Sequence, residues 1–228
     1  MDQVIDIVNV MEDRQRLAPN VEIKWTIGVI ADMTQVTYQL EELPSAQMFE
    51  SIVSEALAGD GSALFTIGTM FEFGAVFLKD LSLARVLTVS ADSKVARDLF
   101  VAAEATGHKE ASFRLGLMAH HGIVQPADQQ LAAWHFERGA ENGHPTCYRM
   151  LGIYATFASD LELARHCFLL GARLDDPICC FNTALEIEKG NLLGYTLHDS
   201  IVFAGRAADQ LPEDDEIQNF FKRLSSSH

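Results

Sequence analysis

The stretch that decides the fold runs from residue 107 to residue 175 and repeats one pattern twice. It reads GHKEASFRLGLMAHHG at 107–122, LAAWHFERGAENG at 131–143, HPTCYRMLGIYATFA at 144–158 and LARHCFLLGARLD at 163–175. Small and apolar residues recur in both copies at the spacing of one helical face. The segments before and after fall into the same register, so the chain is predicted to be a repeat array.

Four anchor residues mark equivalent positions in the copies: Gly59, Gly107, Gly143 and Asp175. A small residue follows each anchor by four positions, and glycine or alanine follows by nine, at 68, 116, 152 and 184. Together with apolar residues eight positions after most anchors, this spacing predicts that each copy opens with an amphipathic helix. We expect the small residue at the ninth position to let another helix approach closely.

A second helix is predicted before each anchor, because apolar residues recur eleven, seven and three positions upstream. Glu104 interrupts this stripe, and Ala103 beside it is able to take its place. The anchors are 48, 36 and 32 residues apart, and the excess length of the first spacing falls within residues 75–92. Each copy is therefore expected to be a helix–turn–helix pair that buries its apolar face against the next pair.

The repeats are predicted to span residues 45–211, with a fourth pair of helices at 177–188 and 200–210. Residues 212–228 are expected to form a capping helix and a tail, because acidic residues open this segment and basic ones lie near its end. Residues 1–44 do not fit the repeat. Residues 2–16 suit a helix, and 21–30 and 34–40 suit two strands of a β-hairpin. Such a hairpin packs on the repeats or pairs with a partner, unless the segment is helical.

The repeated pattern resembles the Sel-one-like repeat family, which is related to the tetratricopeptide repeats. The strongest matches are ASFRLGLMAHHG from Ala111 with LAAWHFERGAENG from Leu131, and CYRMLGIYATFA from Cys147 with LELARHCFLLGA from Leu161. This resemblance implies an all-α fold, a right-handed αα solenoid of about four helix pairs. It also implies an adaptor or assembly role, often in bacterial signalling and host interaction.

Composition narrows the classes of partner and compartment. The formal net charge is -15, from 32 acidic and 17 basic residues, which disfavours nucleic acid and membrane surfaces and favours a basic protein partner. The four cysteines follow no zinc-binding or disulfide spacing, so we interpret them as free thiols. The N-terminus lacks the basic start of a signal peptide, and a cytoplasmic location is expected.

No catalytic constellation is apparent, and no enzyme activity, cofactor or metal is predicted. His120, His121, His135, His144 and Cys147 lie close in sequence and raise the alternative of a metal site. Their spacing matches no known ligand motif, and Cys147 occupies a position where other copies carry alanine. Cys179 and Cys180 raise the alternative of redox chemistry, but packing explains a small residue at position 179 more simply.

In solenoids the first helix of each pair usually faces the inside of the curve, and four positions of each such helix are expected to point there. These positions are unusually rich in phenylalanine, which predicts an apolar groove for an extended peptide or an amphipathic helix. The candidate partner-binding residues are Phe65, Phe73, Phe113, Leu117, His120, His121, Arg149, Ile153, Phe157 and Phe181. Two alternatives remain. In the first, the groove is filled by the chain itself, either by the N-terminal segment or by the helix that contains Phe220 and Phe221. In the second, the helix phase differs by one residue and the phenylalanines are buried between helices.

The function predicted from these features is a protein–protein interaction scaffold that binds a partner polypeptide in its groove. One alternative is a cytoplasmic immunity or chaperone-type protein that neutralises a cognate toxin or effector. A small metal-dependent hydrolase is the third and least favoured hypothesis.

Overall fold

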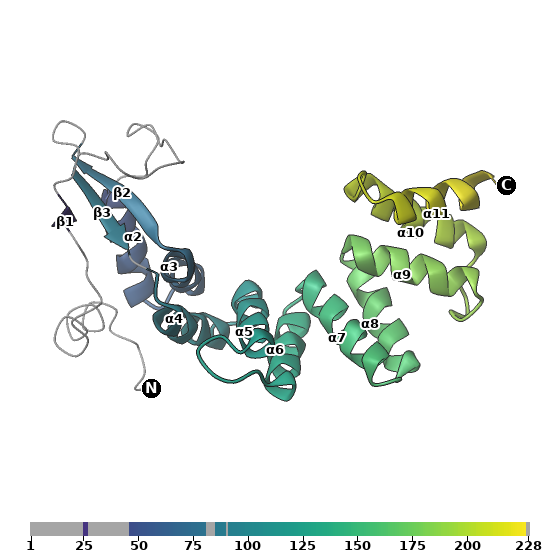
Figure 1. The fold of residues 1–228 in the computed structure, drawn as a ribbon, viewed down its shortest axis with the longest axis horizontal. Coiled ribbons are helices and arrows are strands. Elements are labelled where there is room, and N and C mark those ends of the chain that lie inside the picture. The colour runs from purple at the N-terminus through teal and green to yellow at the C-terminus, as the bar shows by residue number, and fades with distance from the viewer. Residues whose placement is uncertain (1–24, 27–45, 81–84, 90, 227–228) are drawn as a thin grey trace. The chain divides into compact units, whose positions relative to one another are not determined.

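The structure is a computed structural model that describes residues 25–26, 46–80, 85–89 and 91–226 (Figure 1). Within these ranges it contains ten helices and three short strands, and the strands are confined to residues 25–89. The predicted all-α repeat class is thus confirmed. The chain divides into two compact units, one that ends at Ala127 and one that begins at Asp128.

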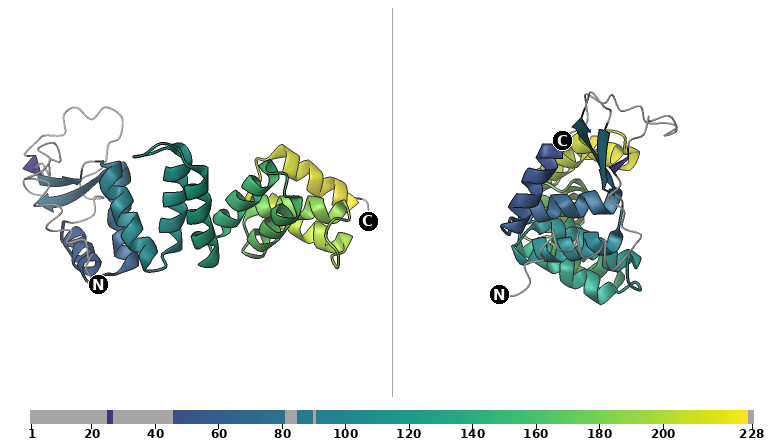
Figure 2. Two further views of the ribbon diagram at one scale, coloured as in Figure 1. Left: turned by 90° about the horizontal axis from the view of Figure 1, so that it is seen from below. Right: turned by 90° about the vertical axis from the view of Figure 1, so that its left-hand side faces the viewer.

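The first unit contains four described helices and a small sheet. Consecutive helices lie side by side, and α3 packs on both α2 and α4 (Figure 2). The elements are β1 (Trp25–Thr26), α2 (Ala46–Leu57), α3 (Gly61–Phe73), β2 (Ala75–Asp80), β3 (Arg85–Val89), α4 (Ser93–Ala105) and α5 (Lys109–His121).

The extra residues of the first repeat form a β-hairpin, which the sequence analysis did not predict. Strands β2 and β3 pair antiparallel, with Phe77 opposite Leu87, and β1 pairs with the other side of β3. Of the strand expected at 21–30, only β1 is described, and its described partner is β3. The predicted helix at 2–16 and the predicted strand at 34–40 lie outside the described residues.

The second unit is a run of six helices in which each helix packs on the next. Helix α9 has the predicted bounds. Helix α10 begins three residues before the predicted start because Thr196, its N-cap, forms a reciprocal capping box with Asp199 in its first turn. The elements are α6 (Gln129–Glu141), α7 (Pro145–Phe157), α8 (Leu161–Arg173), α9 (Pro177–Glu188), α10 (Leu197–Gln210) and α11 (Asp215–Ser226).

The anchor residues are where the second helix of one pair turns into the first helix of the next. All four have left-handed backbone angles, with φ of 89° at Gly59, 87° at Gly107, 76° at Gly143 and 68° at Asp175. Glycine adopts this conformation without the steric cost that a Cβ imposes, and aspartate tolerates it better than most residues. The recurring anchors therefore reflect one turn geometry.

The same hydrogen bonds close every anchor turn. The anchor N–H donates to the carbonyl three residues earlier, and the next N–H donates to the carbonyl five residues earlier, as in a Schellman motif. The residue after the anchor then begins the following helix. Asp60 and Asp176 cap it by accepting hydrogen bonds from the backbone N–H groups of Ala63 and Cys179, at 2.7 and 2.9 Å. The turn ends one helix and starts the next within two residues.

Close helix packing at the ninth position after the anchor is confirmed at two glycines. A Cβ added to Gly68 would lie 2.6 Å from the ring of Phe100, and one added to Gly152 would lie 2.7 Å from the ring of Phe168. Both rings come from the seventh position before the next anchor. The two most regular features of the repeat therefore contact each other inside a helix pair.

The small residues four positions after the anchors are all buried, as the pattern predicts: Ala63, Ala111, Cys147 and Cys179. Two positions of the second-helix stripe differ from the pattern. Met48 on α2 is 54% exposed, and Glu104 on α4 is buried together with Ala103.

We predict that Gly152→Ala lowers the free energy of unfolding by about 1–3 kcal/mol, because the new methyl group collides with the Phe168 ring. The matched control is Gly205→Ala on α10, where a Cβ would lie 3.3 Å from the Phe221 ring. That ring needs to yield only slightly, and alanine favours a helix over glycine, so the control should cost less. Denaturant unfolding of both variants measures the difference, and equal losses would contradict this packing.

Candidate functional site

The ten candidate partner-binding residues lie on the first helices of the pairs, six in the first unit and four in the second. We call the part of each unit that they occupy its first-helix surface. Phe65 and Phe73 are on α3, and the next four are on α5. Arg149, Ile153 and Phe157 are on α7, and Phe181 is on α9. None of the ten is buried: Phe73, His121 and Phe157 are exposed, and the other seven are intermediate.

On α3 the two candidate phenylalanines, Phe65 and Phe73, differ in how much of the ring the chain itself covers. The Phe65 ring stacks on the ring of His108, with centroids 4.6 Å apart, and lies 5.5 Å from that of Phe100. Phe73, by contrast, is 65% exposed at the end of the helix. Phe65 therefore has a packing role, whereas most of the Phe73 side chain is exposed.

Arg114 of α5 connects the open end of α3 to the next pair. Its guanidinium lies 5.4 Å from the centroid of the Phe73 ring and 3.6 Å from the carboxylate of Glu72. Burial raises the pKa of Glu72, and the positive charge of Arg114 opposes that rise. A cation on an aromatic face and a half-buried carboxylate give this corner a mixed polar and apolar character.

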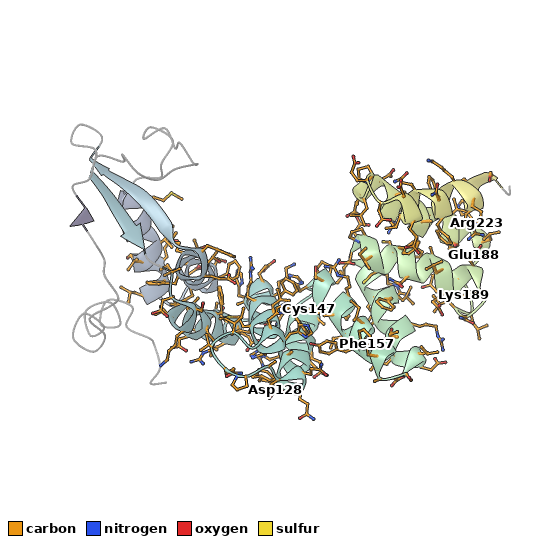
Figure 3. All side chains as sticks on the ribbon, in the orientation of Figure 1. Asp128, Cys147, Phe157, Glu188, Lys189 and Arg223 are labelled. Carbon is orange, nitrogen blue, oxygen red and sulfur yellow. The ribbon has the colours of Figure 1, made fainter. Side chains whose placement is uncertain are left out.

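In the second unit, Arg149 interacts with the chain itself. Its guanidinium lies 3.5 Å from the carboxylate of Asp176, which is 4% exposed at the start of α9. Ile153 packs against a core cluster of the same unit. Phe157 is 84% exposed at the end of α7 (Figure 3). Of these three predicted residues, Phe157 is the one whose side chain is largely free for contact.

Helix α11 packs on the first-helix surface of the fourth pair, which agrees for this pair with the alternative that the chain fills its own surface. The rings of Phe181 and Phe220 meet edge to face with centroids 5.4 Å apart. Arg223 donates two hydrogen bonds to the carboxylate of Glu188, at 2.5 and 3.0 Å (Figure 3). Phe181 is thus part of an internal contact, and Phe220 is buried.

The sequence analysis did not identify the ion pairs Arg149–Asp176 and Glu188–Arg223. Each joins residues far apart in the chain, and periodicity alone does not indicate which charged residues meet. The sequence does contain one signal for the Arg149–Asp176 ion pair. An aspartate directly before Pro177 is typical of a helix start, and a residue at the start of α9 lies close to the helices of the preceding repeat.

The thiols of the second unit are buried, which makes redox chemistry there unfavourable. Burial is the main cause that raises the pKa of Cys180 to about 11, and it also raises the pKa of Cys167 and Cys179. A thiol that remains protonated is a poor nucleophile and a poor metal ligand.

Across the described ranges, no three histidine, cysteine, aspartate or glutamate side chains lie together as a metal site would require. His120 and His121 lie next to each other, with ring centroids 4.8 Å apart. His135 is largely buried on α6, and its ring contacts that of Trp134. Within the same ranges, no helix has the length and hydropathy needed to cross a membrane.

We predict that acid weakens the contact between α9 and α11. The hydrogen bonds from Arg223 lower the pKa of Glu188 below its ordinary 4.5, so their contribution to stability is present above pH 4.5 and is lost as pH falls below it. Because the Arg223 side chain is 57% exposed and that of Glu188 is 27% exposed, screening by solvent should keep the contribution of the pair small. Glu188→Gln should therefore lose less stability than the wild type between about pH 6 and pH 3.

Thermal unfolding across this pH range measures the effect. The wild type, Glu188→Gln, Arg223→Gln and the double variant together form a double-mutant cycle. Non-additive effects near neutral pH are expected if the two side chains act as a pair. Identical pH dependence of the wild type and Glu188→Gln would contradict the role of this carboxylate.

Comparisons with known proteins identify the fold and leave the function open. No protein-family model and no curated protein matches this sequence. Several solved structures match the three-dimensional arrangement.

Two of these structures share the repeat. A Sel1 repeat protein from Oxalobacter formigenes has 18% sequence identity and a TM-score of 0.55, over 73% of this chain and 63% of that one. A protective antigen of uropathogenic Escherichia coli strains, which displays a Sel1-like repeat fold, has 17% identity and a TM-score of 0.53, over 70% of this chain and 33% of that one. This chain thus spans less than two thirds of either protein. The described part of the chain has the fold of the Sel1 repeat proteins.

Proposed function

We propose that the chain is a protein–protein interaction scaffold that binds a partner polypeptide through its first-helix surface. The observation that carries the proposal is the partial exposure of apolar side chains at equivalent positions of successive first helices. Leu117 on α5 and Ile153 on α7 occupy the same position after their anchors, and both are half-buried. No catalytic residue is assigned.

The packing of α11 on α9 supports an amphipathic helix as the kind of ligand that suits this surface. Phe220 of α11 supplies an aromatic ring to Phe181, and Arg223 supplies a positive charge to Glu188. Helices bind in apolar grooves through side chains spaced in this way. A partner helix with aromatic and basic residues on one face would make contacts of the same kind on other first helices.

Repeat folds of this type stack helix pairs into extended surfaces, which generally bind other proteins. The fold therefore supports a scaffold in general terms, and the charge refines the proposal. A formal net charge of -15 attracts a basic partner and speeds its association, chiefly at low salt. We propose a partner with a basic, apolar face for these reasons.

Affinity capture from cells that contain the natural partner, followed by a binding measurement with the purified partner, tests this function. We predict that the double variant Leu117→Asn and Ile153→Asn weakens binding by about tenfold or more, because each change removes apolar contact area. A matched control carries Leu169→Asn and Leu170→Asn, two half-buried leucines of the second helix α8. Thermal unfolding first establishes that both double variants fold.

Equal affinity of the two folded double variants would contradict the first-helix surface as the binding site. A captured partner that is a toxin, neutralised on co-expression, would assign the chain to the immunity class. A stoichiometric bound metal in the purified protein would instead revive the hydrolase hypothesis.

A further inference from the structure

The turn between α6 and α7 contains the only asparagine–glycine step of the sequence. Asn142 ends α6 as its C-cap, and Gly143 is the anchor residue with a φ of 76°. Asn142 is exposed, and Gly143 is half-buried. A side-chain amide in contact with water therefore lies directly before a residue that carries no Cβ.

The backbone nitrogen that follows an asparagine is able to react with the asparagine side chain. The nitrogen forms a bond to the side-chain carbonyl carbon, the bond from that carbon to the amide nitrogen breaks, and the amide leaves as ammonia with the proton of the attacking N–H. The product is a cyclic succinimide. Water then opens the ring at either of its two carbonyls, which yields aspartate or isoaspartate. The net change is the uptake of one water and the loss of one ammonia.

The surroundings of Gly143 leave room for this ring to close. A side chain on the residue after an asparagine hinders the approach of its nitrogen, and glycine has none. Apart from the chain neighbours of Gly143, no atom of the described residues would lie within 4 Å of a Cβ added there. Steric hindrance at this step is therefore low, both from the residue itself and from the rest of the unit.

Hydrogen bonds of the anchor turn hold both reacting groups while the turn is closed. The Gly143 N–H, which must lose its proton to attack, donates to the carbonyl of Ala140 at 2.9 Å. The side-chain amide of Asn142 donates to the carbonyl of Arg138, also at 2.9 Å. Both bonds must break before the ring closes, so the reaction requires local opening of the turn.

We propose that Asn142 is a site of spontaneous covalent modification, at which the folded chain forms aspartate and isoaspartate each time the α6–α7 turn opens long enough for ring closure. Water is the only co-reactant, and no enzyme, cofactor or oxidant takes part. The proposal goes beyond the proposed function and does not depend on it, because the reaction involves no partner.

Both products weaken the end of α6. A carboxylate replaces the amide at residue 142, so the donor to the carbonyl of Arg138 is lost. The new negative charge lies at the C-terminus of the helix, where the helix dipole disfavours it. Residue 142 precedes the turn into α7, so the modification acts at the junction of two repeats.

Isoaspartate has a second effect, because it lengthens the main chain. The backbone then runs through the side-chain carbon, which adds one methylene between residue 142 and Gly143. The two hydrogen bonds that close the turn, from Gly143 to Ala140 and from His144 to Gly139, depend on the normal spacing. Isoaspartate is therefore expected to disturb this turn more than aspartate does.

Asn191 provides a matched comparison within the same unit. It is also exposed and follows a helix end, and its side-chain amide donates to the carboxylate of Glu186 at 2.8 Å. Its backbone N–H donates to the carbonyl of Glu186 at 2.9 Å. The residue that follows it is Leu192 rather than glycine. A difference in reactivity between the two asparagines therefore reports mainly on the following residue.

The test is incubation of the purified full chain at body temperature and mildly alkaline pH, followed by peptide mapping with mass spectrometry against an unincubated sample. We expect the peptide that contains residue 142 to gain about 1 Da and to do so at least about tenfold faster than the peptide that contains Asn191. In denaturant the conversion at residue 142 should be faster than in the folded chain by about tenfold or more, because opening is no longer required.

Asn142→Gln is the control variant, because its side-chain carbonyl lies one carbon further from the backbone nitrogen and the same ring cannot form. It should fold like the wild type and keep the mass of this peptide. An unchanged wild-type mass at residue 142, or equal conversion at Asn142 and Asn191, would overturn the proposal. Equal rates in the folded and the denatured chain would overturn the dependence on turn opening.

Ion exchange separates the modified chains, which carry one more negative charge, and thermal unfolding compares them with Asn142→Asp. That variant has the new charge on a normal backbone. The isoaspartate form should unfold at a lower temperature than Asn142→Asp, and equal midpoints would contradict the effect of the longer main chain. None of these outcomes involves a partner, so a failure here leaves the proposed function to its own test.

Discussion

The packing of a phenylalanine ring directly over a helical glycine is the contact that joins the two helices of the first and of the third pair. Phe100 covers Gly68 in the first pair, and Phe168 covers Gly152 in the third. Without a Cβ on the glycine, the two helices approach closely enough for the ring to fill the space between them. In a close-packed interior even one added methyl group forces a shift. The recurring residues of the repeat are therefore mainly those that form this contact and those that form the anchor turns.

The anchor turns act between pairs, where they connect the second helix of one pair to the first helix of the next. Each turn reverses the chain within two residues, using a left-handed anchor and the same two backbone hydrogen bonds. Asp175 keeps this geometry at the position where the other anchors are glycine. A left-handed backbone is less favourable for aspartate than for glycine. The exposed carboxylate of Asp175 lies 3.9 Å from Arg206. Turn geometry, rather than the identity of the residue, is what recurs.

Periodicity predicted the helices well because the physical constraint is local. Small residues and rings recur every few positions, and the bounds of α9 followed from them directly. The hairpin of β2 and β3 was missed although residues 85–89, RVLTV, are rich in β-branched and apolar types. Its segment was interpreted only as extra length within a helical repeat. A strand signal inside a repeat array is easily masked by the stronger helical period on either side.

The candidate site could be predicted only in part. Offsets from the anchors identified side chains that the structure leaves half-buried or exposed, such as Leu117 and Phe73. They did not reveal which of them the chain itself contacts. Phe181 packs directly on Phe220, and Arg149 pairs directly with Asp176, although both partners lie on other helices, far along the chain. Such long-range partners depend on how the pairs stack, which no single helix encodes.

The surface left after packing has two distinct parts, and each follows from the repeat. First helices keep one face free of the pair-to-pair core, and the turns at their ends extend beyond it. In the second unit the first part contains Ile153, and the second contains Leu193 on a loop held by Asn191 and Tyr195. In the proposed function, the scaffold and the ligand surface occupy different positions of the same repeat.

Hydrogen–deuterium exchange with and without the captured partner tests the central claim most directly, namely that first helices bind the partner. The account predicts slower exchange of backbone amides in α5 and α7 when the partner is bound, with little change in the second helices α4 and α8. Protection confined to α4 and α8, or no protection in any described helix, would contradict it.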